Sequence, residues 1–392
     1  MRVILTFLFL FAILIGMSSE SPKVFNGFLI SEGSSGKKIT FNNPGFQLKE
    51  ITKDGVSFHK PEMENSGSLS SPGEPFLPST STYFAVQPGK KYNVSVNVID
   101  KETISNVELG SLVTWDDQEG SVEKINLTNS FEHQLYPNDL AIVSDPIIMR
   151  DIVVVQVTVT PFQYDALNKE LTVINQLDVE LIEYGDIAQP FTPSKRSRVF
   201  EPFYESLVVN YDMINRDVYE YQKPSILYVL PSNIGNLLGV VEELFDWKRR
   251  VGYEVNYISS SNVVNNKNNL KNYIENAYET WDNPPEYVTI IGDAEGSYDI
   301  PTWNETWSGY YGEGDHPYSL LEGNDQYPEV FLGRISFDTQ SHLTTQISKL
   351  LNYESSPYMG ENWFTRACLT GDASTSGISC VITNEHIHEI LD

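Results

Sequence analysis

Short alternating runs of apolar and polar residues fill the first half of the chain. Between residues 22 and 190, segments such as KYNVSVNVID and DIVVVQVTVTPF are rich in β-branched residues, and Gly, Pro, Asn and Asp clusters separate them. A period of two places successive side chains on opposite faces of a strand, so that one face can be buried. Several such strands with turns between them are typical of an antiparallel sandwich. We therefore predict a β-sandwich domain over residues 21–192.

Strand and helix patterns alternate beyond residue 224. The compact apolar runs expected as strands are SILYVLP, EVNYISS, EYVTIIG and PEVFLGRIS. The segments with apolar residues at helical spacing are NLLGVVEELFDWKRR, NLKNYIENAYETW and SHLTTQISKLLNYE. Strands that alternate with helices form a parallel sheet with right-handed crossovers. This pattern predicts an α/β subdomain over residues 224–362, with ligands beyond the carboxyl ends of its strands, where Asp293 follows the third strand.

Residues 363–392 begin the same pattern again. WFTRACLTGDAS is expected to form a strand that ends at Gly371 and Asp372, and TNEHIHEILD is expected to open a helix in which the sequence stops. Cys368 is then most simply a small core residue of that strand. We interpret residues 363–392 as the start of a second α/β subdomain, truncated in this sequence.

A basic segment joins the two regions. The stretch PFTPSKRSRVFEPF carries Lys195, Arg196 and Arg198 among Pro and Ser, in a chain otherwise poor in basic residues. Such a stretch between folded regions is expected to be exposed and open to proteases. We predict a linker and processing region over residues 193–223, in which one of these basic residues marks removal of the first domain. An ordinary linker is the alternative.

The N-terminus has the layout of a signal peptide. A single Arg precedes a predominantly apolar run from Val3 to Ile15, and small and polar residues follow it. The run is shorter than the roughly 20 residues that a membrane span needs. We predict that residues 1–20 are a signal peptide and that the mature protein is secreted, either free or at the cell surface. A retained N-terminal anchor is the alternative.

Charge and cysteine content exclude several classes of partner and scaffold. The chain has 53 acidic and 26 basic residues, a net charge of -27, which repels nucleic acid and anionic lipid headgroups. We therefore expect no nucleic-acid partner, and after the signal peptide no segment is long and apolar enough to span a membrane. Only two cysteines occur, so the chain is not a disulfide-dense scaffold.

Three carboxylates cluster in the stretch EGNDQYPEVFLGRIS. Glu322, Asp325 and Glu329 stand directly before an apolar strand, and a Gly-Asn pair between them favours a tight turn. Like charges at this spacing repel unless a cation lies among them. Calcium takes about six to eight oxygens from carboxylates and carbonyls, which suits a loop better than the strict octahedron of magnesium. On the residues alone a solvated acidic turn is the favoured interpretation, and the alternative is a calcium site that Asp293 joins from a neighbouring strand end.

The stretch GDHPYSLLEGNDQYPEVFLGRISFDTQSHLTTQISKLLNYE resembles a segment of the gingipain-like cysteine peptidases. The shared features, in order, are a D-x-x-Y pair at Asp315 and Tyr318, a G-N-D turn, an E-V-F-aliphatic-G-R strand and a helix that ends in Tyr-Glu. FDWKRRVGYEV and YVTIIGD are also similar, and PGEPFLPSTSTYFAVQPG resembles the propeptide of the family. The resemblance implies a caspase-like catalytic domain of two side-by-side α/β subdomains and a β-sandwich propeptide bound to it in cis. It also implies a structural calcium ion whose ligands are Asp293, the Glu322 carbonyl, Asp325, the Tyr327 carbonyl and Glu329.

The catalytic pair that the resemblance implies is not present in this sequence. The family places a His in a His-Gly pair and a Cys nucleophile tens of residues later, but none of the six His here precedes a Gly. Asp372 lies close to the position of the acid that orients the His, although that acid could map onto Ser374, and a solvated Asp is the alternative. Cys380 with His386 and His388 makes a poor dyad or zinc site, because the two His point to different faces of a helix.

Together these features predict a zymogen, the secreted proenzyme of a gingipain-like cysteine endopeptidase. It would hydrolyse protein or peptide substrates through a Cys/His dyad that lies beyond the end of this chain. The chain itself is expected to be inactive, because nucleophile and base must lie within hydrogen-bond reach of each other. The alternative is a secreted, calcium-stabilised binding or adhesion module that kept the fold without the catalysis. A His-Gly pair and a later strand ending in Cys, in the residues encoded next, would support the peptidase.

Overall fold

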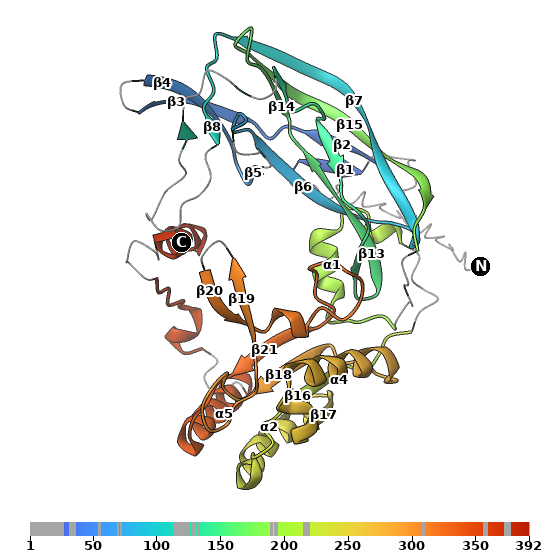
Figure 1. Ribbon diagram of the computed structural model, residues 1–392, viewed down its shortest axis with the longest axis vertical. Helices are drawn as coiled ribbons and strands as arrows, with labels where there is room; N and C mark the ends of the chain where they lie inside the picture. The colour runs from blue at the N-terminus through green and yellow to red at the C-terminus, as the bar shows by residue number, and fades with distance from the viewer. Residues whose placement is uncertain are drawn as a thin grey trace, which may run out of the picture.

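The computed structural model has a β-rich half and an α/β half, and helix α1 (Glu201–Leu207) lies between them (Figure 1). The structure describes residues 27–30, 37–53, 56–68, 70, 73–112, 125–126, 131, 134–188, 191, 195–214, 220–307, 310–355, 360–371 and 378–391. The predicted signal peptide, residues 1–20, lies outside the described residues.

Two antiparallel sheets make up most of the β-rich half. The first has the order β1 (Phe28–Ile30), β2 (Lys38–Asn42), β15 (Glu170–Asp186), β14 (Phe162–Asp165) and β10 (Leu135–Tyr136), and β7 (Lys90–Ser105) also pairs with β15. The second has the order β11 (Ala141–Val143), β13 (Ile152–Val159), β6 (Pro78–Ala85) and β5 (Gly67–Ser68), and β12 (Ile147–Met149) also pairs with β13. Two smaller antiparallel pairs are β3 (Phe46–Lys53) with β4 (Val56–Met63), and β8 (Ser111–Leu112) with β9 (Ile125–Asn126).

The two large sheets share one apolar core. Phe41 and Leu177 come from the first sheet and Phe84 and Val157 from the second, and all four are 0 % exposed. Alternate residues along β6 are buried, as the two-residue period of the sequence predicts. The prediction of an antiparallel sandwich is therefore confirmed for this half.

A four-stranded sheet forms the centre of the α/β half. Its strands are all parallel and have the order β17 (Glu254–Ile258), β16 (Ser225–Val229), β18 (Tyr287–Ile291) and β21 (Phe331–Ile335). One face packs on α2 (Leu238–Arg250) and α5 (Gln340–Glu354), and the other packs on α4 (Lys267–Thr280). The side chains of Asn266 and Thr339 cap α4 and α5 by accepting hydrogen bonds from main-chain N–H groups of the first turn. The predicted order of strands and helices is confirmed.

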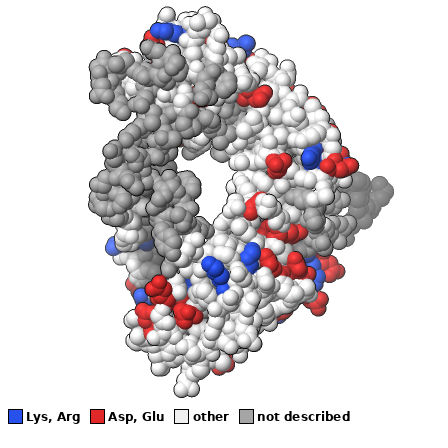
Figure 2. Space-filling view, in the orientation of Figure 1, with Lys and Arg blue, Asp and Glu red and all other residues white. Residues whose placement is uncertain are grey.

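Shorter elements connect this framework. Helix α3 (Ser261–Val264) precedes α4, and the antiparallel pair β19 (Trp303–Trp307) and β20 (Tyr310–Gly314) follows β18. Short 3-10 turns lie at Tyr211–Met213, Gly235–Leu237, His316–Tyr318 and Asn362–Thr365. Figure 2 shows acidic side chains spread over the visible face, some of them near the junction of the two halves, as the net charge of -27 leads one to expect.

The expected strand at WFTRACLTGDAS does not form in the described residues. The 3-10 turn ends at Thr365, and residues 366–371 are exposed and irregular. A strand needs a partner to satisfy its backbone groups, and no described strand pairs with this segment. Cys368 is exposed, so its interpretation as a core residue was wrong. The expected helix after it is confirmed as α6 (Ile378–Leu391).

Within the described part of the chain, no helix combines the length and apolar character that a membrane crossing requires.

Candidate functional site

The acidic loop, residues 322–329, stands at the amino edge of the parallel sheet because it leads directly into β21. Glu329 is 0 % exposed, and its Oε2 accepts hydrogen bonds from the N–H groups of Leu321 (2.7 Å) and Glu322 (3.2 Å). Its Oε1 is buried and has no hydrogen-bond partner. Burial raises the pKa of Glu329 to about 8, against the lowering effect of the two N–H bonds. A buried carboxylate with one unsatisfied oxygen is the strongest sign of a cation site in this loop.

The other two carboxylates of the acidic loop have defined partners. Asp325 accepts a hydrogen bond from the N–H of Tyr327 at 2.9 Å and one from the N–H of Ile148, in the sandwich, at 3.1 Å. Burial raises the pKa of Asp325, although both N–H bonds lower it. Glu322 Oε2 accepts a hydrogen bond from the hydroxyl of Tyr278 at 3.1 Å. The loop is therefore held in place by contacts on both sides of the junction between the two halves.

Asp293 lies at the opposite edge of the sheet from the acidic loop. It follows β18, and β18 runs parallel to β21 with Tyr287 beside Phe331 and Ile291 beside Ile335. Each strand has five residues, so roughly 15 Å of strand separates Asp293 from the loop. The prediction that Asp293 joins the acidic loop was wrong, because that loop precedes its strand whereas Asp293 follows one.

The remaining predicted ligands fit a cation in part. Asp325 and the unsatisfied oxygen of Glu329 supply carboxylates, and the carbonyls of Glu322 and Tyr327 belong to the same loop. Within the described residues, no group of three or more His, Cys, Asp or Glu side chains is arranged to hold a metal ion. A calcium ion here would therefore depend on carbonyl oxygens, which calcium accepts readily.

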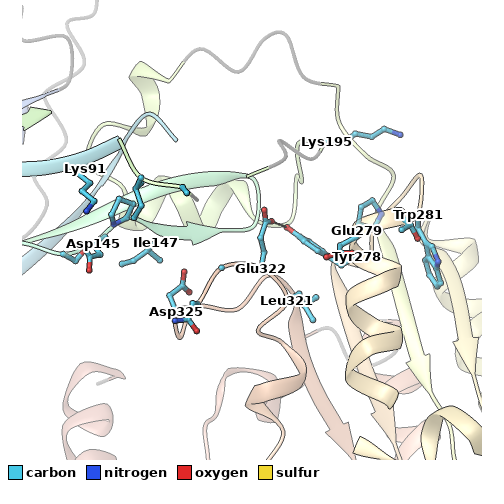
Figure 3. A pocket seen from close by; sticks show the side chains of 18 of the residues that line it. Lys91, Asp145, Ile147, Lys195, Tyr278, Glu279, Trp281, Leu321, Glu322 and Asp325 are labelled. Carbon is cyan, nitrogen blue, oxygen red and sulfur yellow. Dashed lines mark hydrogen bonds between the residues drawn. The ribbon is translucent and has the colours of Figure 1, made fainter. Parts of the chain in front are cut away.

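A cavity of about 1350 Å³ opens beside this loop, between the sandwich and the α/β half. Figure 3 shows Glu322 and Asp325 between Asp145 and Ile147 of the sandwich and Tyr278 of α4. The acidic loop therefore lines the junction rather than a free surface.

Arg334 forms a clamp at the carboxyl edge of the sheet. Its guanidinium donates to both carboxylate oxygens of Asp315, from Nε at 2.7 Å and from Nη2 at 2.8 Å. Its Nη1 donates to the carbonyls of Gly292 (3.1 Å) and Ile300 (3.0 Å). Thr302 also donates to Asp315, at 2.8 Å. The Asp and Arg of the quoted motifs thus fix the loop that follows β18, a role that sequence reasoning missed although both residues had been singled out.

The predicted processing residues are held more firmly than an open linker would be. Arg196 exchanges main-chain hydrogen bonds with Glu220 (3.0 Å) and Gln222 (2.9 Å). Ser197 is 0 % exposed, and its hydroxyl donates to the buried carboxylate of Glu286. Lys195 and Arg198 are exposed, and the Arg198 guanidinium lies 4.7 Å from the centre of the Tyr221 ring. The expectation of an exposed segment holds for Lys195 and Arg198 but not for Ser197, because this segment is paired with the start of the α/β half.

The remaining candidate residues add no site. Asp372, predicted to orient a catalytic His, lies outside the described residues. Cys380, His386 and His388 are exposed on α6.

Comparison with known proteins places the two halves in one family. Residues 19–219 match the family model of the C25 propeptide, and residues 219–392 match peptidase family C25. Among curated proteins, gingipain R2 of Porphyromonas gingivalis is 24% identical over 354 residues, covering 88% of this chain and 47% of the relative. Lys-gingipain of the same species is 22% identical over 351 residues, covering 84% of this chain and 20% of the relative.

Solved structures with some similarity come from the same group. A complex of Porphyromonas gingivalis RgpB pro- and mature domains matches with a TM-score of 0.40 and 23% identity, over 47% of this chain and 96% of that chain. The Arg-specific cysteine proteinase gingipain R matches with a TM-score of 0.34 and 25% identity, over 43% of this chain and 38% of that chain. The chain spans about half the length of gingipain R2, or less of the longer relatives. The two family matches meet at residue 219, and on their strength the chain belongs to peptidase family C25, with a propeptide region followed by a peptidase region.

Proposed function

We propose that this chain is part of the secreted proenzyme of a cysteine endopeptidase. The observation that carries the proposal is the succession of a C25 propeptide match and a C25 peptidase match along one chain. In this reading the sandwich is the propeptide, and residues 224–362 are the first subdomain of a caspase-like catalytic domain. Residues 1–20 direct export, and the substrates are proteins or peptides.

The proposed reaction is hydrolysis of a peptide bond by a thiolate nucleophile, with a His that accepts and returns the proton. Both groups would come from residues encoded after this chain. The part described here supplies the framework on which they act. Arg334 fixes the carboxyl-edge loop after β18, where ligands of parallel sheets bind. Asp372 is proposed to orient the His.

We further propose a structural calcium ion at the acidic loop. Glu329 and Asp325 would bind it with carboxylate oxygens, and Glu322 and Tyr327 would bind it with their carbonyls. The unsatisfied Oε1 of Glu329 supports this assignment, and Asp293 is not part of the set. Calcium would supply positive charge that keeps the buried carboxylates ionised and the loop ordered.

The test uses the whole encoded protein, activated by removal of its propeptide. Hydrolysis of mixed peptide substrates in the presence of reductant and calcium is expected, and a thiol-alkylating reagent should abolish it. Replacement of the Cys that follows the next His-Gly pair should abolish hydrolysis while the folded state is retained. An intact, folded protein that binds its targets but never hydrolyses peptides would refute the proposal and support the adhesion alternative.

A further inference from the structure

The turn between β12 and β13 carries a fully buried arginine. We name residues 147–152 the Arg150 hairpin; each of them is between 0 % and 7 % exposed. Arg150 itself is 0 % exposed and has a φ of 52°, in the left-handed region that residues with a Cβ rarely occupy. A hairpin turn usually meets solvent. This one is inserted between the propeptide region and the peptidase region.

The guanidinium of Arg150 is bound almost entirely by the peptidase region. Nη1 donates to the carbonyls of Glu329 (2.7 Å) and Pro285 (3.0 Å), and Nη2 donates to Gln222 Oε1 (3.0 Å) and the carbonyl of Pro284 (3.4 Å). These four residues all stand just before strands of the parallel sheet, so the pocket belongs to its amino edge. Prolines have no N–H and cannot extend β18 backward as a paired strand, which leaves their carbonyls free to face a guanidinium.

Aromatic rings and further hydrogen bonds complete the pocket. The rings of Phe200 and Tyr278 have centres 5.1 Å and 5.4 Å from the guanidinium carbon. The single Tyr278 hydroxyl proton is shared between Glu322 Oε2 and the carbonyl of Arg150, each at 3.1 Å, and the N–H of Ile148 in the hairpin donates to Asp325 at 3.1 Å. The pocket therefore supplies acceptors for both terminal nitrogens of the guanidinium, while Nε is buried without a hydrogen-bond partner.

We propose that the Arg150 hairpin is the docking element that keeps the propeptide bound to the peptidase region after the chain between them is cut, and that Arg150 is its dominant residue. This rests on the proposed function, in which the sandwich is a removable propeptide. A buried arginine that fills a desolvated pocket at the centre of an interface is typical of an energetic hot spot. Its removal takes the guanidinium donor away from the carbonyls of Pro285 and Glu329, which is costly, whereas the Pro284 carbonyl still accepts from Gln222 and Ser225. The hairpin binds the amino edge of the sheet, whereas ligands of parallel sheets bind at the carboxyl edge. Binding of the hairpin can therefore be measured independently of whether the propeptide covers a site at the carboxyl edge.

The experiment asks whether two cut pieces stay together. A recognition sequence for a site-specific protease is inserted within residues 215–219, where the two family matches meet, and the folded full chain is cut there. Gel filtration over a dilution series then measures the dissociation constant of the two pieces. Association needs no peptidase activity, so this result and a failure of the proposed function are distinguishable.

The wild-type pieces are expected to remain associated, and Arg150→Ala should weaken their association about 30-fold or more. The matched control is Lys90→Ala, which removes a cationic side chain whose ion pairs with Glu183 and Asp186 lie within the sandwich. That control should leave the dissociation constant unchanged. Guanidinium ion, far below denaturing concentrations, should restore association of the Arg150→Ala pieces, whereas methylammonium ion should not, because guanidinium presents several N–H donors in a fixed fork and methylammonium is a compact point charge.

Two results would overturn the proposal: wild-type pieces that separate as soon as the chain is cut, or Arg150→Ala pieces that bind as tightly as wild type. Should the Arg150→Ala chain fail to fold before cutting, Arg150→Lys carries the test. The Lys side chain keeps the charge, but its single nitrogen cannot replace the two donor nitrogens that bind four acceptors, so the substitution should also weaken association. Unchanged binding by the Arg150→Lys pieces would then refute the dominant role of the guanidinium.

Discussion

Replacement of Glu329 by Gln should remove a pH dependence from the stability of the α/β half. Glu329 is 0 % exposed, and one of its carboxylate oxygens lacks a partner. Burial raises its pKa from 4.5 to about 8. In the unfolded chain the same carboxyl is exposed and ionises near its ordinary pKa. The Gln side chain has nearly the same shape and no charge, so it removes the titration with little change in packing.

The direction of the effect follows from proton binding. Between about pH 4.5 and pH 8 the folded state holds a proton on Glu329 that the unfolded state has released. The stabilising difference is fully present below the unfolded pKa and is lost as pH rises through this window. The slope is at most about 1.4 kcal/mol per pH unit, so the free energy of unfolding should fall by up to about 4 kcal/mol between about pH 5 and pH 8 without calcium.

The assay is urea unfolding in the presence of chelator, followed by tryptophan fluorescence, which reports on the α/β half through Trp247, Trp281 and Trp303. Wild type should lose stability steadily over the window, and Glu329→Gln should show a much flatter profile. Glu50→Gln, which changes an exposed carboxylate on β3, is the matched control and should follow wild type. Parallel pH profiles for wild type and Glu329→Gln would refute the reasoning.

Three further predictions concern the metal, the clamp and the linker. Calcium at about 100 times its dissociation constant should raise the free energy of unfolding of the wild-type chain by about 2.7 kcal/mol near pH 8, measured by urea unfolding. The same calcium should stabilise Glu329→Gln far less. Equal unfolding midpoints with calcium and with chelator would refute the metal proposal. Arg334→Met should lower the free energy of unfolding by about 3 kcal/mol in the same assay, because it leaves the partly buried Asp315 without its cation. Lys90→Met, which removes one partner of an exposed ion pair, should lower it by less than about 1 kcal/mol. Similar losses in the two variants would contradict the role of Arg334 as a clamp. Trypsin should cleave the folded chain slowly within residues 195–198. Tyr221→Ala removes the ring beside Arg196 and Arg198, so cleavage of this variant should be faster on a gel time course. If wild type is cleaved as fast as the variant, the segment is open.

The elements of the α/β half could be predicted because their patterns are local. Leu270 and Ile274 stand four residues apart in the sequence and lie together on the buried face of α4. The apolar run of β18 marks a strand whose two faces are both covered by helices, the usual setting of a parallel sheet. Such periodicities depend only on residues a few positions apart, so one sequence is sufficient to reveal them.

The role of Arg150 could not be predicted in the same way. In the sequence it stands in IIMRDIVVV, where an Arg-Asp pair between two apolar runs is typical of a solvated turn. Its burial arises from Gln222, Pro285 and Glu329, which are far away along the chain. Contacts of this kind leave no periodic signal. The pairing of Ser197 with Glu286 was missed for the same reason.

The error over Asp293 has a different origin, in the direction of the strands. A parallel sheet has two unlike edges, and acidic residues near a strand belong to one edge or the other according to whether they precede or follow it. Glu329 precedes β21 and Asp293 follows β18. The sequence contained this information, but the prediction grouped the residues by their chemistry and not by their order relative to the strands.

The separation of the two edges limits how the Arg150 hairpin, or a cation at the acidic loop, could act on the proposed catalytic site. The Arg150 hairpin and the acidic loop meet at the amino ends of β18 and β21, whereas Arg334 joins Gly292 and Ile300 near the carboxyl ends. Neither the hairpin nor a cation at Glu329 can touch a substrate bound beyond the carboxyl edge, because a strand of five residues lies between. Their influence must pass along β21, from Glu329 at its start to Arg334 near its end. Because close-packed interiors transmit strain, loss of either contact should alter the position of Arg334 and the loop it holds.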